Sequence, residues 1–387
     1  MLLRSALAPI ALVALLGLPS MAAVIPVTTL LDTSGGPACT LRDAITAAET
    51  DVATGSCAAG SGADSIDLSA LAGVITLIAP LPTLGSSDRG IEIVGPGAAL
   101  LAVSGNGLYV VFTNTGAFAV SRIAGVTIRD GFGHCVYAEG RTRIEDARVT
   151  GCSGGAALDT GEQGFLLRVE RTLIDNNADT AIRVGGFSGS GGLLLVNSTV
   201  SGNAGGIFIQ NADGPGGQQQ IYASTLADNG VANLKIGFNQ QALLDGVLML
   251  GASGRPPTPN CVLQGVSDPV TLPPNLTSSN SLDNDGSCGL VGSGDQERVD
   301  PLLEALSENG GPTRTRALLE GSPAIDAGAS PCNGPDGPLT VDQRGLPRPQ
   351  GAACDIGAFE VPEAAATLAG IAAIAALRAL RRCGRSC

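Results

Sequence analysis

Tryptophan is absent from this 387-residue sequence, which also has only one histidine, one lysine and three tyrosines. A single histidine and the lack of any CxxC pair exclude a Cys/His zinc set. Basic residues are scarce: 22 Lys and Arg against 35 Asp and Glu give a formal charge of −13, which argues against nucleic acid as a partner. What the sequence has is 55 glycines without a triplet period and 44% hydrophobic residues, so it is neither collagen-like nor disordered.

Both ends of the chain have the features of processing signals. Residues 1–22 contain one basic residue, an apolar stretch over 6–18 and small residues before Ala23, which predicts a secretory signal peptide cut after Ala22. Residues 361–387 contain Val-Pro-Glu, an apolar run and four arginines, which predicts a C-terminal sorting or transmembrane tail with cytoplasmic arginines. Both apolar runs, expected to be helical, are shorter than the roughly 20 residues of a bilayer span. We therefore expect an exported chain whose tail is either a transient sorting segment or an anchor.

The middle of the chain repeats a short apolar strand that ends in a polar turn. The period is about 24 residues, and examples stand at 172–176, 199–203 and 225–229. Short β-branched strands with Gly and Asn turns at this period predict a parallel β-solenoid, because a single coil buries its apolar face only against neighbouring coils. The expected fold is therefore all-β, a right-handed parallel β-helix with its coils over 67–262.

Three asparagines occupy one position of successive repeats. When the repeats are aligned on the threonines at which they begin, Asn176, Asn203 and Asn229 coincide. Asn tolerates the left-handed backbone of a sharp corner, and its amide can bond to the copies above and below. We interpret these residues as a structural asparagine ladder; the alternative is a row of ligand-binding side chains.

Residues 23–66 contain the one clear helix signal. The segment 40–43 (Thr-Leu-Arg-Asp) fits a capping box, and Leu41, Ala44, Ile45 and Ala48 share one face. An amphipathic helix at this place would close the open end of the solenoid core. Weaker strand patterns stand at 64–68, 74–78, 90–94 and 108–112.

Two groups of motifs resemble known families. Residues 39–45 (Cys-Thr-Leu-Arg-Asp-Ala-Ile) resemble the Cys-Ser-Leu-Arg-Glu-Ala motif near the start of many secreted bacterial β-helix proteins. Segments within 263–360 resemble the choice-of-anchor Q domain, described as right-handed parallel β-helices with interchangeable C-terminal sorting tails. The tail is similar to the PEP-type exosortase signal of Gram-negative bacteria, with Val-Pro-Glu-Ala where a second proline is usual. The resemblance implies a Gram-negative surface protein processed by a sorting protease, and supplies no catalytic residues. The segments that carry the second resemblance are 300–303, 309–313, 321–328, 342–345 and 354–360.

Eight cysteines lie between the terminal segments, an even number that indicates disulfides in an oxidising compartment. Because each coil of a solenoid contacts only its neighbours, we expect sequence-neighbouring cysteines to pair, each disulfide contributing about 3 kcal/mol. The alternative for the second pair is two buried thiols. The predicted disulfides are Cys39–Cys57, Cys135–Cys152, Cys261–Cys288 and Cys332–Cys354.

Catalytic candidates are few. Nucleophilic catalysis needs a base, and the only histidine, His134, lies in a Gly-rich turn, while the only lysine, Lys235, lies in a predicted strand. Acids on coil turns are usually just solvated. An enzyme on this scaffold would nevertheless draw on a group of residues within about one coil, which are Asp159, Glu162, Glu170, Asp175 and Arg183.

The segment 283–286 (Asp-Asn-Asp-Gly) begins like a calcium loop, but its glycine comes too early and no Glu follows at the EF-hand position. We expect a turn beside Cys288 and no metal site; Ca²⁺, which a lyase would use, has no supporting motif. Without its ends the chain carries a charge of −17, so its surface repels polyanions unless divalent cations bridge them.

The sequence as a whole predicts an exported β-helix protein, anchored at the cell surface or released. Its expected role is non-catalytic, in adhesion, matrix contact or glycan binding. The expected partners are an extracellular polysaccharide or the cell-surface matrix, and the membrane through the tail. The alternative is a polysaccharide lyase or glycoside hydrolase on the same scaffold.

Overall fold

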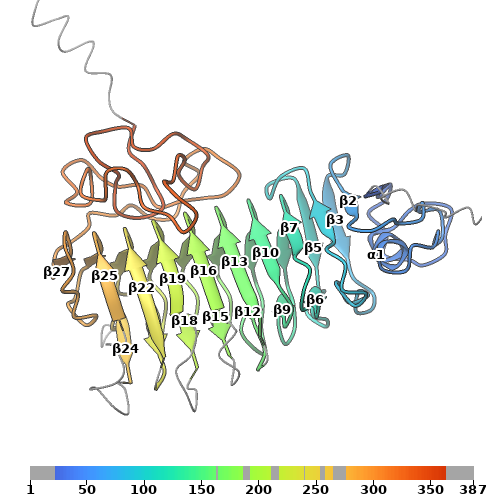
Figure 1. Ribbon diagram of the computed structural model, residues 1–387, viewed down its shortest axis with the longest axis horizontal. Helices are drawn as coiled ribbons and strands as arrows, with labels where there is room; N and C mark the ends of the chain where they lie inside the picture. The colour runs from blue at the N-terminus through green and yellow to red at the C-terminus, as the bar shows by residue number, and fades with distance from the viewer. Residues whose placement is uncertain are drawn as a thin grey trace, which may run out of the picture.

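The computed structural model describes residues 22–362, except for 163, 186–191, 211–217, 239, 253–257 and 265–275. Within these residues the chain winds into three parallel sheets of ten, ten and seven strands, stacked along one long axis (Figure 1). The first sheet consists of β1 (Val24–Pro26), β2 (Ser65–Asp67), β4 (Glu92–Val94), β7 (Ser121–Ala124), β10 (Thr142–Glu145), β13 (Leu166–Glu170), β16 (Gly192–Val196), β19 (Gln218–Tyr222), β22 (Gln241–Asp245) and β25 (Leu276–Ser279).

The other two sheets complete each coil. The second sheet consists of β3 (Gly73–Thr76), β5 (Leu101–Ser104), β8 (Thr127–Arg129), β11 (Arg148–Thr150), β14 (Leu173–Asp175), β17 (Thr199–Ser201), β20 (Thr225–Ala227), β23 (Leu248–Leu250), β26 (Leu282–Asp283) and β27 (Gln296–Glu297). The third consists of β6 (Phe112–Asn114), β9 (Val136–Ala138), β12 (Leu158–Asp159), β15 (Thr180–Val184), β18 (Gly205–Ile209), β21 (Leu234–Ile236) and β24 (Cys261–Leu263). This is the parallel β-solenoid that the repeats predict, and its sheets extend past 67–262 at both ends.

The core is a set of aliphatic stacks inside the three sheets. In the first sheet, one register position on successive coils holds Ile123, Ile144, Val169, Leu195 and Ile221, all fully buried. Each such side chain contributes roughly 1.5–3 kcal/mol by leaving water. Because the rungs are about 4.8 Å apart, every coil depends on the next for this burial.

The helix α1 (Leu41–Thr50) lies at the N-terminal end of the stack, as expected of a cap (Figure 1). The Thr40 hydroxyl accepts the N–H of Asp43 at 3.1 Å, which is half of the predicted capping box. The other half differs, because the Asp43 carboxylate accepts from Ser34 Oγ at 2.9 Å and Gly35 N at 3.0 Å instead of from Thr40 N. The helix cap therefore also holds the preceding loop.

One predicted strand, 108–112, is largely a turn. The N–H groups of Leu108 and Tyr109 both donate to the Gly105 carbonyl at 3.0 Å, and Asn106 has a φ of +60°. These local bonds bend the chain, so that β6 begins only at Phe112. The strand patterns at 64–68, 74–78 and 90–94 correspond to β2, β3 and β4.

An asparagine ladder runs through the solenoid, but it contains Asn177 where the sequence predicted Asn176. The Asn177 amide donates to Asn203 Oδ1 at 2.8 Å, and the Asn203 amide donates to Asn229 Oδ1 at 2.9 Å. The error is a one-residue slip of alignment, because Leu173, not Thr172, pairs with Thr199.

The left-handed corner also lies one residue before the ladder. Asn176, Gly202 and Asp228 have φ values of +52°, +70° and +56°, whereas the ladder asparagines that follow are not among the positive-φ residues. Asn176 is accordingly exposed, while the ladder side chains are buried. The corner thus divides two tasks between adjacent residues: one adopts the unusual backbone, and the next supplies the amide.

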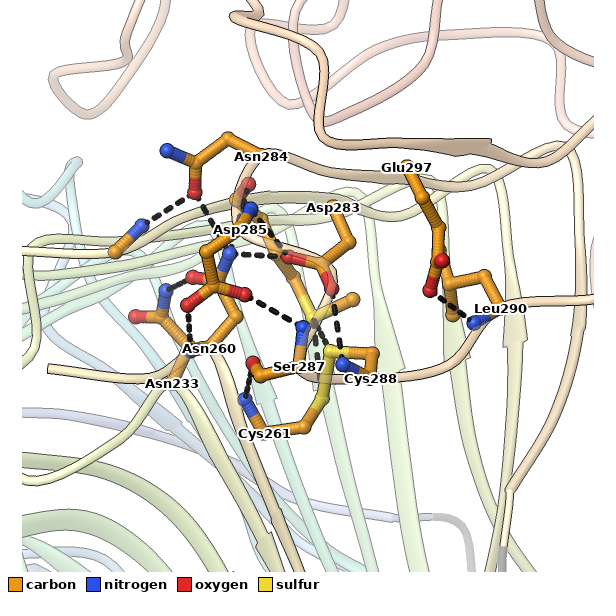
Figure 2. The surroundings of a disulfide bond; sticks show 12 residues. Asn233, Asn260, Cys261, Asp283, Asn284, Asp285, Ser287, Cys288, Leu290 and Glu297 are labelled. Carbon is orange, nitrogen blue, oxygen red and sulfur yellow. Dashed lines mark hydrogen bonds between the residues drawn. A yellow bond between two sulfur atoms is a disulfide. The ribbon is translucent and has the colours of Figure 1, made fainter.

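The ladder continues to the C-terminal end of the solenoid. The Asn229 amide donates to Asn233 Oδ1 at 2.7 Å. Asn233 in turn donates to Asn260 Oδ1 at 2.5 Å, and Asn260 donates to Asp283 Oδ1 at 2.5 Å (Figure 2). The chain of amides therefore ends on a carboxylate. Burial raises the pKa of Asp283, against the hydrogen bonds that it accepts from Cys288 N and Asn260.

All four predicted disulfides are present. Two of them bracket the ladder: Cys152 N donates to Asn177 Oδ1 at 3.0 Å, and Cys261 follows Asn260 directly. The alternative of buried thiols at Cys135 and Cys152 is therefore wrong. The bonds tie together segments that are 17 to 27 residues apart in sequence.

The segment 299–362 folds back over the outside of the solenoid (Figure 1). It covers the second sheet and, through Asp336 and Leu339, part of the first. Leu318, Ala324 and Ile356 pack on Leu248 of β23 and Leu282 of β26. We call this segment the C-terminal cover. Leu339 of the cover packs on Leu194, Val196 and Tyr222 of the first sheet, and polar contacts also hold the cover in place.

Several of those polar contacts involve residues of the motifs that resemble the choice-of-anchor Q domain, such as Gln343 and Glu360. Arg348 is buried with Glu360, at 3.0 Å, and donates to Asn197 Oδ1 at 2.8 Å in the bend between β16 and β17. Thr199 Oγ1 donates to Gln343 Oε1 at 2.6 Å, across the face of β17. A buried arginine needs such a full set of acceptors, which explains why the motif segments are rich in acids and amides.

The predicted signal peptide and the sorting tail lie outside the described residues, apart from Ala22, Val361 and Pro362. Among the residues that are described, no helix is long and apolar enough to cross a membrane.

The ladder leads to a stability prediction for Asn203→Val. The change removes the bonds that the Asn203 side chain makes with Asn177, Asn229 and the Ile174 carbonyl in the core, so we expect the free energy of unfolding to fall by about 3 kcal/mol. Denaturant titration measures this difference. Asn176→Gly, at the exposed left-handed corner, is the matched control and should change the free energy of unfolding by less than about 1 kcal/mol. Equal stability of the two variants would contradict the ladder.

The cover leads to a pH prediction. Asp355 accepts from Asp326 N at 2.8 Å and Val361 N at 2.6 Å, and burial, reinforced by Glu360 and opposed by Arg348, raises its pKa from 3.8 to about 6. Because the folded state binds the proton more tightly, the contribution of Asp355 to stability grows as the pH falls from 7 toward 4, and is lost as the pH rises through 6.

Denaturant titrations of wild type and Asp355→Asn at pH 5 and pH 7 test this. The free energy of unfolding of the wild type minus that of the variant should be about 1 kcal/mol larger at pH 5 than at pH 7. A difference that does not change with pH would show that Asp355 titrates normally.

Candidate functional site

The outer face of the first sheet carries a row of arginines whose charges are neutralised. Arg122, Arg143 and Arg168 stand on successive coils in register. Glu145 pairs with the first two and Glu170 with the last two. Burial alone would raise the pKa of Glu170, but hydrogen bonds from Arg143 and Arg168 outweigh burial and lower it. Glu170 is therefore an ionised member of a structural network.

The outer face of the second sheet is engaged by the C-terminal cover. Asp175 is fully buried and pairs with Arg148 of β11 at 2.8 Å and with Arg314 of the cover at 2.7 Å. A hollow of about 380 Å³ remains beside this contact, lined in part by Arg129. Asp175 accepts from two arginines at once, which makes it an anchor point for the cover.

The outer face of the third sheet lies on the side away from the cover (Figure 1). One register position on five successive coils brings chemically distinct side chains into a line. We call this line, Tyr137, Asp159, Arg183, Phe208 and Lys235, the polar–aromatic column. The strands alternate, so the residues on either side of each column member point into the core and fix the position of its backbone.

The N-terminal half of the column includes an aspartate between an arginine and a histidine. Asp159 is fully buried and forms an ion pair with Arg183 on the next coil. His134, in the turn before β9, places Nδ1 3.4 Å from Asp159 Oδ2 and 2.9 Å from the Ala156 carbonyl oxygen. A carbonyl only accepts, so Nδ1 carries the proton and Nε2 is the acceptor nitrogen of the neutral ring.

Tyr137 stacks on His134, with ring centroids 5.3 Å apart. Burial raises the pKa of the Tyr137 hydroxyl, and the carboxylates of Glu139 and Asp159 add to this effect. The hydroxyl therefore stays protonated near neutral pH and is available as a hydrogen-bond donor.

The C-terminal half of the column is an aromatic ring beneath a cation. Lys235 Nζ lies 4.4 Å from the centroid of the Phe208 ring, a cation–π distance. Both residues line a hollow of about 240 Å³ whose other walls are small or aliphatic: Thr180, Gly205, Gly206, Ile207, Val231 and Ala232. Among the described residues, Lys235 forms no ion pair with a carboxylate.

The residues that the sequence grouped as candidates therefore separate onto three faces. Asp159 and Arg183 meet on the third sheet, while Glu170 belongs to the first and Asp175 to the second. Glu162 lies in the turn after β12, near enough to Tyr137 to affect its pKa. Residues that are close in sequence lie on different faces, because each coil makes a full turn around the solenoid axis.

The calcium-like segment is a turn, as expected. Asp283 Oδ2 accepts from Cys288 N at 2.9 Å, and Asp285 Oδ2 accepts from Asn260 N at 2.9 Å (Figure 2). Ser287 N donates to Asp285 Oδ1 at 2.8 Å, so these carboxylates are occupied by protein donors. In the described part of the chain, no group of three or more His, Cys, Asp or Glu residues is arranged to hold a metal ion.

Sequence reasoning passed over Tyr137 and Phe208. An aromatic residue in a strand is most often part of the core, so the local sequence does not single out either one as a site residue. The signal that would have identified them is register: a correct alignment of the third-sheet strands places Tyr137, Arg183, Phe208 and Lys235 at one outward position. The same alignment brings His134 close to Asp159.

Comparisons with known proteins add little to this geometry. No protein-family model matches the chain, and no curated protein matches it. Among solved structures, that of pectate lyase Pel9A is similar, with a TM-score of 0.40 and 13% identity over 77% of this chain and 88% of the other. A likeness at this level of identity concerns the fold alone.

Proposed function

We propose that this chain is an extracellular, non-catalytic β-helix protein that binds a glycan along the polar–aromatic column. The observation that carries the proposal is the column itself, in which an outward line of aromatic, acidic and basic side chains crosses five coils. The other two faces are less suited to a ligand, because both contact the C-terminal cover, and the arginines of the first sheet are paired with carboxylates.

A linear sugar polymer matches the chemistry of the column. Sugar rings offer apolar C–H faces that pack on aromatic rings such as Phe208, and hydroxyls that bond to carboxylates and guanidinium groups. The column repeats these groups at about 4.8 Å per coil along a straight line, so an extended chain can touch several of them together. Stacked coils also hold these side chains rigidly, which lowers the entropic cost of binding.

Export and anchoring form the second part of the proposal. The four disulfides indicate an oxidising, extracellular compartment. The signal peptide at 1–22, the sorting tail at 361–387 and the resemblance of 263–360 to the choice-of-anchor Q domain support a Gram-negative surface protein, anchored or released by a sorting protease. The cover then lies between the solenoid and the point of attachment in the sequence.

A lyase or hydrolase is the alternative, and the observation that favours it is the group of His134, Asp159 and Arg183. A histidine whose tautomer is fixed by a carbonyl and whose Nδ1 faces a carboxylate is suited to take up a proton at Nε2. An enzyme would release unsaturated or reducing-end products from a bound polysaccharide, and His134→Gln would abolish that release. This result would favour catalysis over the binding role.

Phe208→Ala tests the binding role. A glycan array identifies the ligands of the wild type, and titration calorimetry then compares the variants. Loss of a central aromatic contact should weaken binding about tenfold, since truncation of such anchors costs 1–2 kcal/mol or more. The folded structure should persist, because Phe208 is only half-buried and lies outside the core.

Phe118→Ala is the matched control, since this phenylalanine is 81% exposed and lies outside the third sheet. It should bind as the wild type does. Equal affinity of the Phe208 and Phe118 variants, or a wild type that retains no glycan, would contradict binding along the column.

A further inference from the structure

Lys235 is unusual among the cations of this chain. It is the only lysine of the sequence, in a protein of net charge −13. The arginines of the first sheet share Glu92, Glu145 and Glu170, and Arg183 pairs with Asp159. Lys235, by contrast, contacts an aromatic ring and borders a hollow, with no ion pair to a carboxylate among the described residues.

We propose that the hollow beside Lys235 receives an anionic substituent of the glycan, a carboxylate or a sulfate ester, while the sugar ring that bears it packs on Phe208. The inference rests on the proposed function, and it deepens that function by naming an acidic glycan as the ligand class. The binding of the substituent is electrostatic, and no bond is made or broken.

The shape and lining of the hollow fit this role. Its volume of about 240 Å³ is enough for a small charged group, and Gly205 and Gly206 keep one wall free of side chains. The aliphatic side chains of Ile207, Val231 and Ala232 form part of its lining. A charge with low-dielectric surroundings interacts more strongly with a counter-ion than one in open water does.

The opposite end of the column has the opposite character. Around Tyr137 the carboxylates of Glu139, Asp159 and Glu162 lie close enough to raise the pKa of its hydroxyl. An anionic group would be repelled there and attracted at Lys235, four coils away. The charge of the column therefore changes from negative near β9 to positive at β21. An acidic ligand should bind with its charged group at β21 and its neutral part toward β9.

The net negative charge of the protein favours binding of the anionic group at Lys235 over binding elsewhere on the surface. With so few unneutralised cations, a polyanion gains little elsewhere and is repelled by the remaining charge. One lysine should then account for most of the preference for an acidic over a neutral ligand. A preference that arises from one exposed charge is also sensitive to salt.

Matched sugars and a charge-neutral variant test the proposal. Oligosaccharides of a 1,4-linked glucan and a 1,4-linked galactan, each in neutral, C6-carboxylate and sulfated form, are titrated into wild type, Lys235→Gln, Lys235→Arg and Arg298→Gln. Arg298 is the control, because it carries the same charge, its side chain is 71% exposed, and it lies outside the third sheet.

We expect the wild type to bind an acidic form at least tenfold more tightly than its neutral counterpart at low salt. Lys235→Gln should remove that preference and leave the affinity for the neutral form unchanged, Lys235→Arg should retain most of it, and Arg298→Gln should match the wild type. Whether the carboxylate or the sulfate binds more tightly identifies the source of the charge.

Failure of the anionic subsite and failure of glycan binding would give different results. If neutral and acidic forms bind equally, or if Lys235→Gln weakens both alike, the anionic subsite is wrong while glycan binding stands. If no form of either backbone binds the wild type, the proposed function fails, and the subsite fails with it.

Discussion

Each coil of this chain can bury its apolar side chains only against the coils before and after it, so the register between adjacent coils governs everything else in the structure. A shift of one residue in the first sheet would turn the stack of Ile123, Ile144 and Val169 to the solvent and the arginines of its outer face to the core. The aliphatic stacks favour burial but tolerate many arrangements, because their contacts are not directional.

The asparagine ladder supplies directional hydrogen bonds, which the aliphatic stacks lack. Each ladder amide has one geometry in which it reaches the next asparagine and a backbone carbonyl at once, as Asn203 does with Asn229 and Ile174. A slipped coil would leave these groups buried and unpaired, at a cost of about 1–3 kcal/mol each. The disulfides at Cys152 and Cys261 stand at the two ends of this run and limit slippage there.

With the register established, the three outer faces take different roles. The first sheet pairs its arginines with Glu145 and Glu170, and Arg168 pairs also with Asp336 of the cover. The second presents Asp175 and Thr199 to the C-terminal cover, where Arg314 and the motif residue Gln343 bind them. The third keeps its side chains in line and apart from the cover, which is why it is the face on which we place a ligand. The motifs that resemble the choice-of-anchor Q domain thus have a structural explanation, since they dock the cover onto the solenoid.

The sequence by itself determined the architecture, the capping helix and the pairing of all eight cysteines, because these follow from local patterns: a repeat period, a Thr at a helix start, and contact between neighbouring coils. It did not determine the ladder to the residue, since coils of unequal length allow Thr172 or Leu173 to be matched with Thr199, and only hydrogen bonding across the stack selects Leu173 and hence Asn177. The column was decided by the tertiary structure alone. Its members stand more than 20 residues apart, and a side chain's outward direction depends on the register of its own coil, which no local pattern around Phe208 or Lys235 specifies.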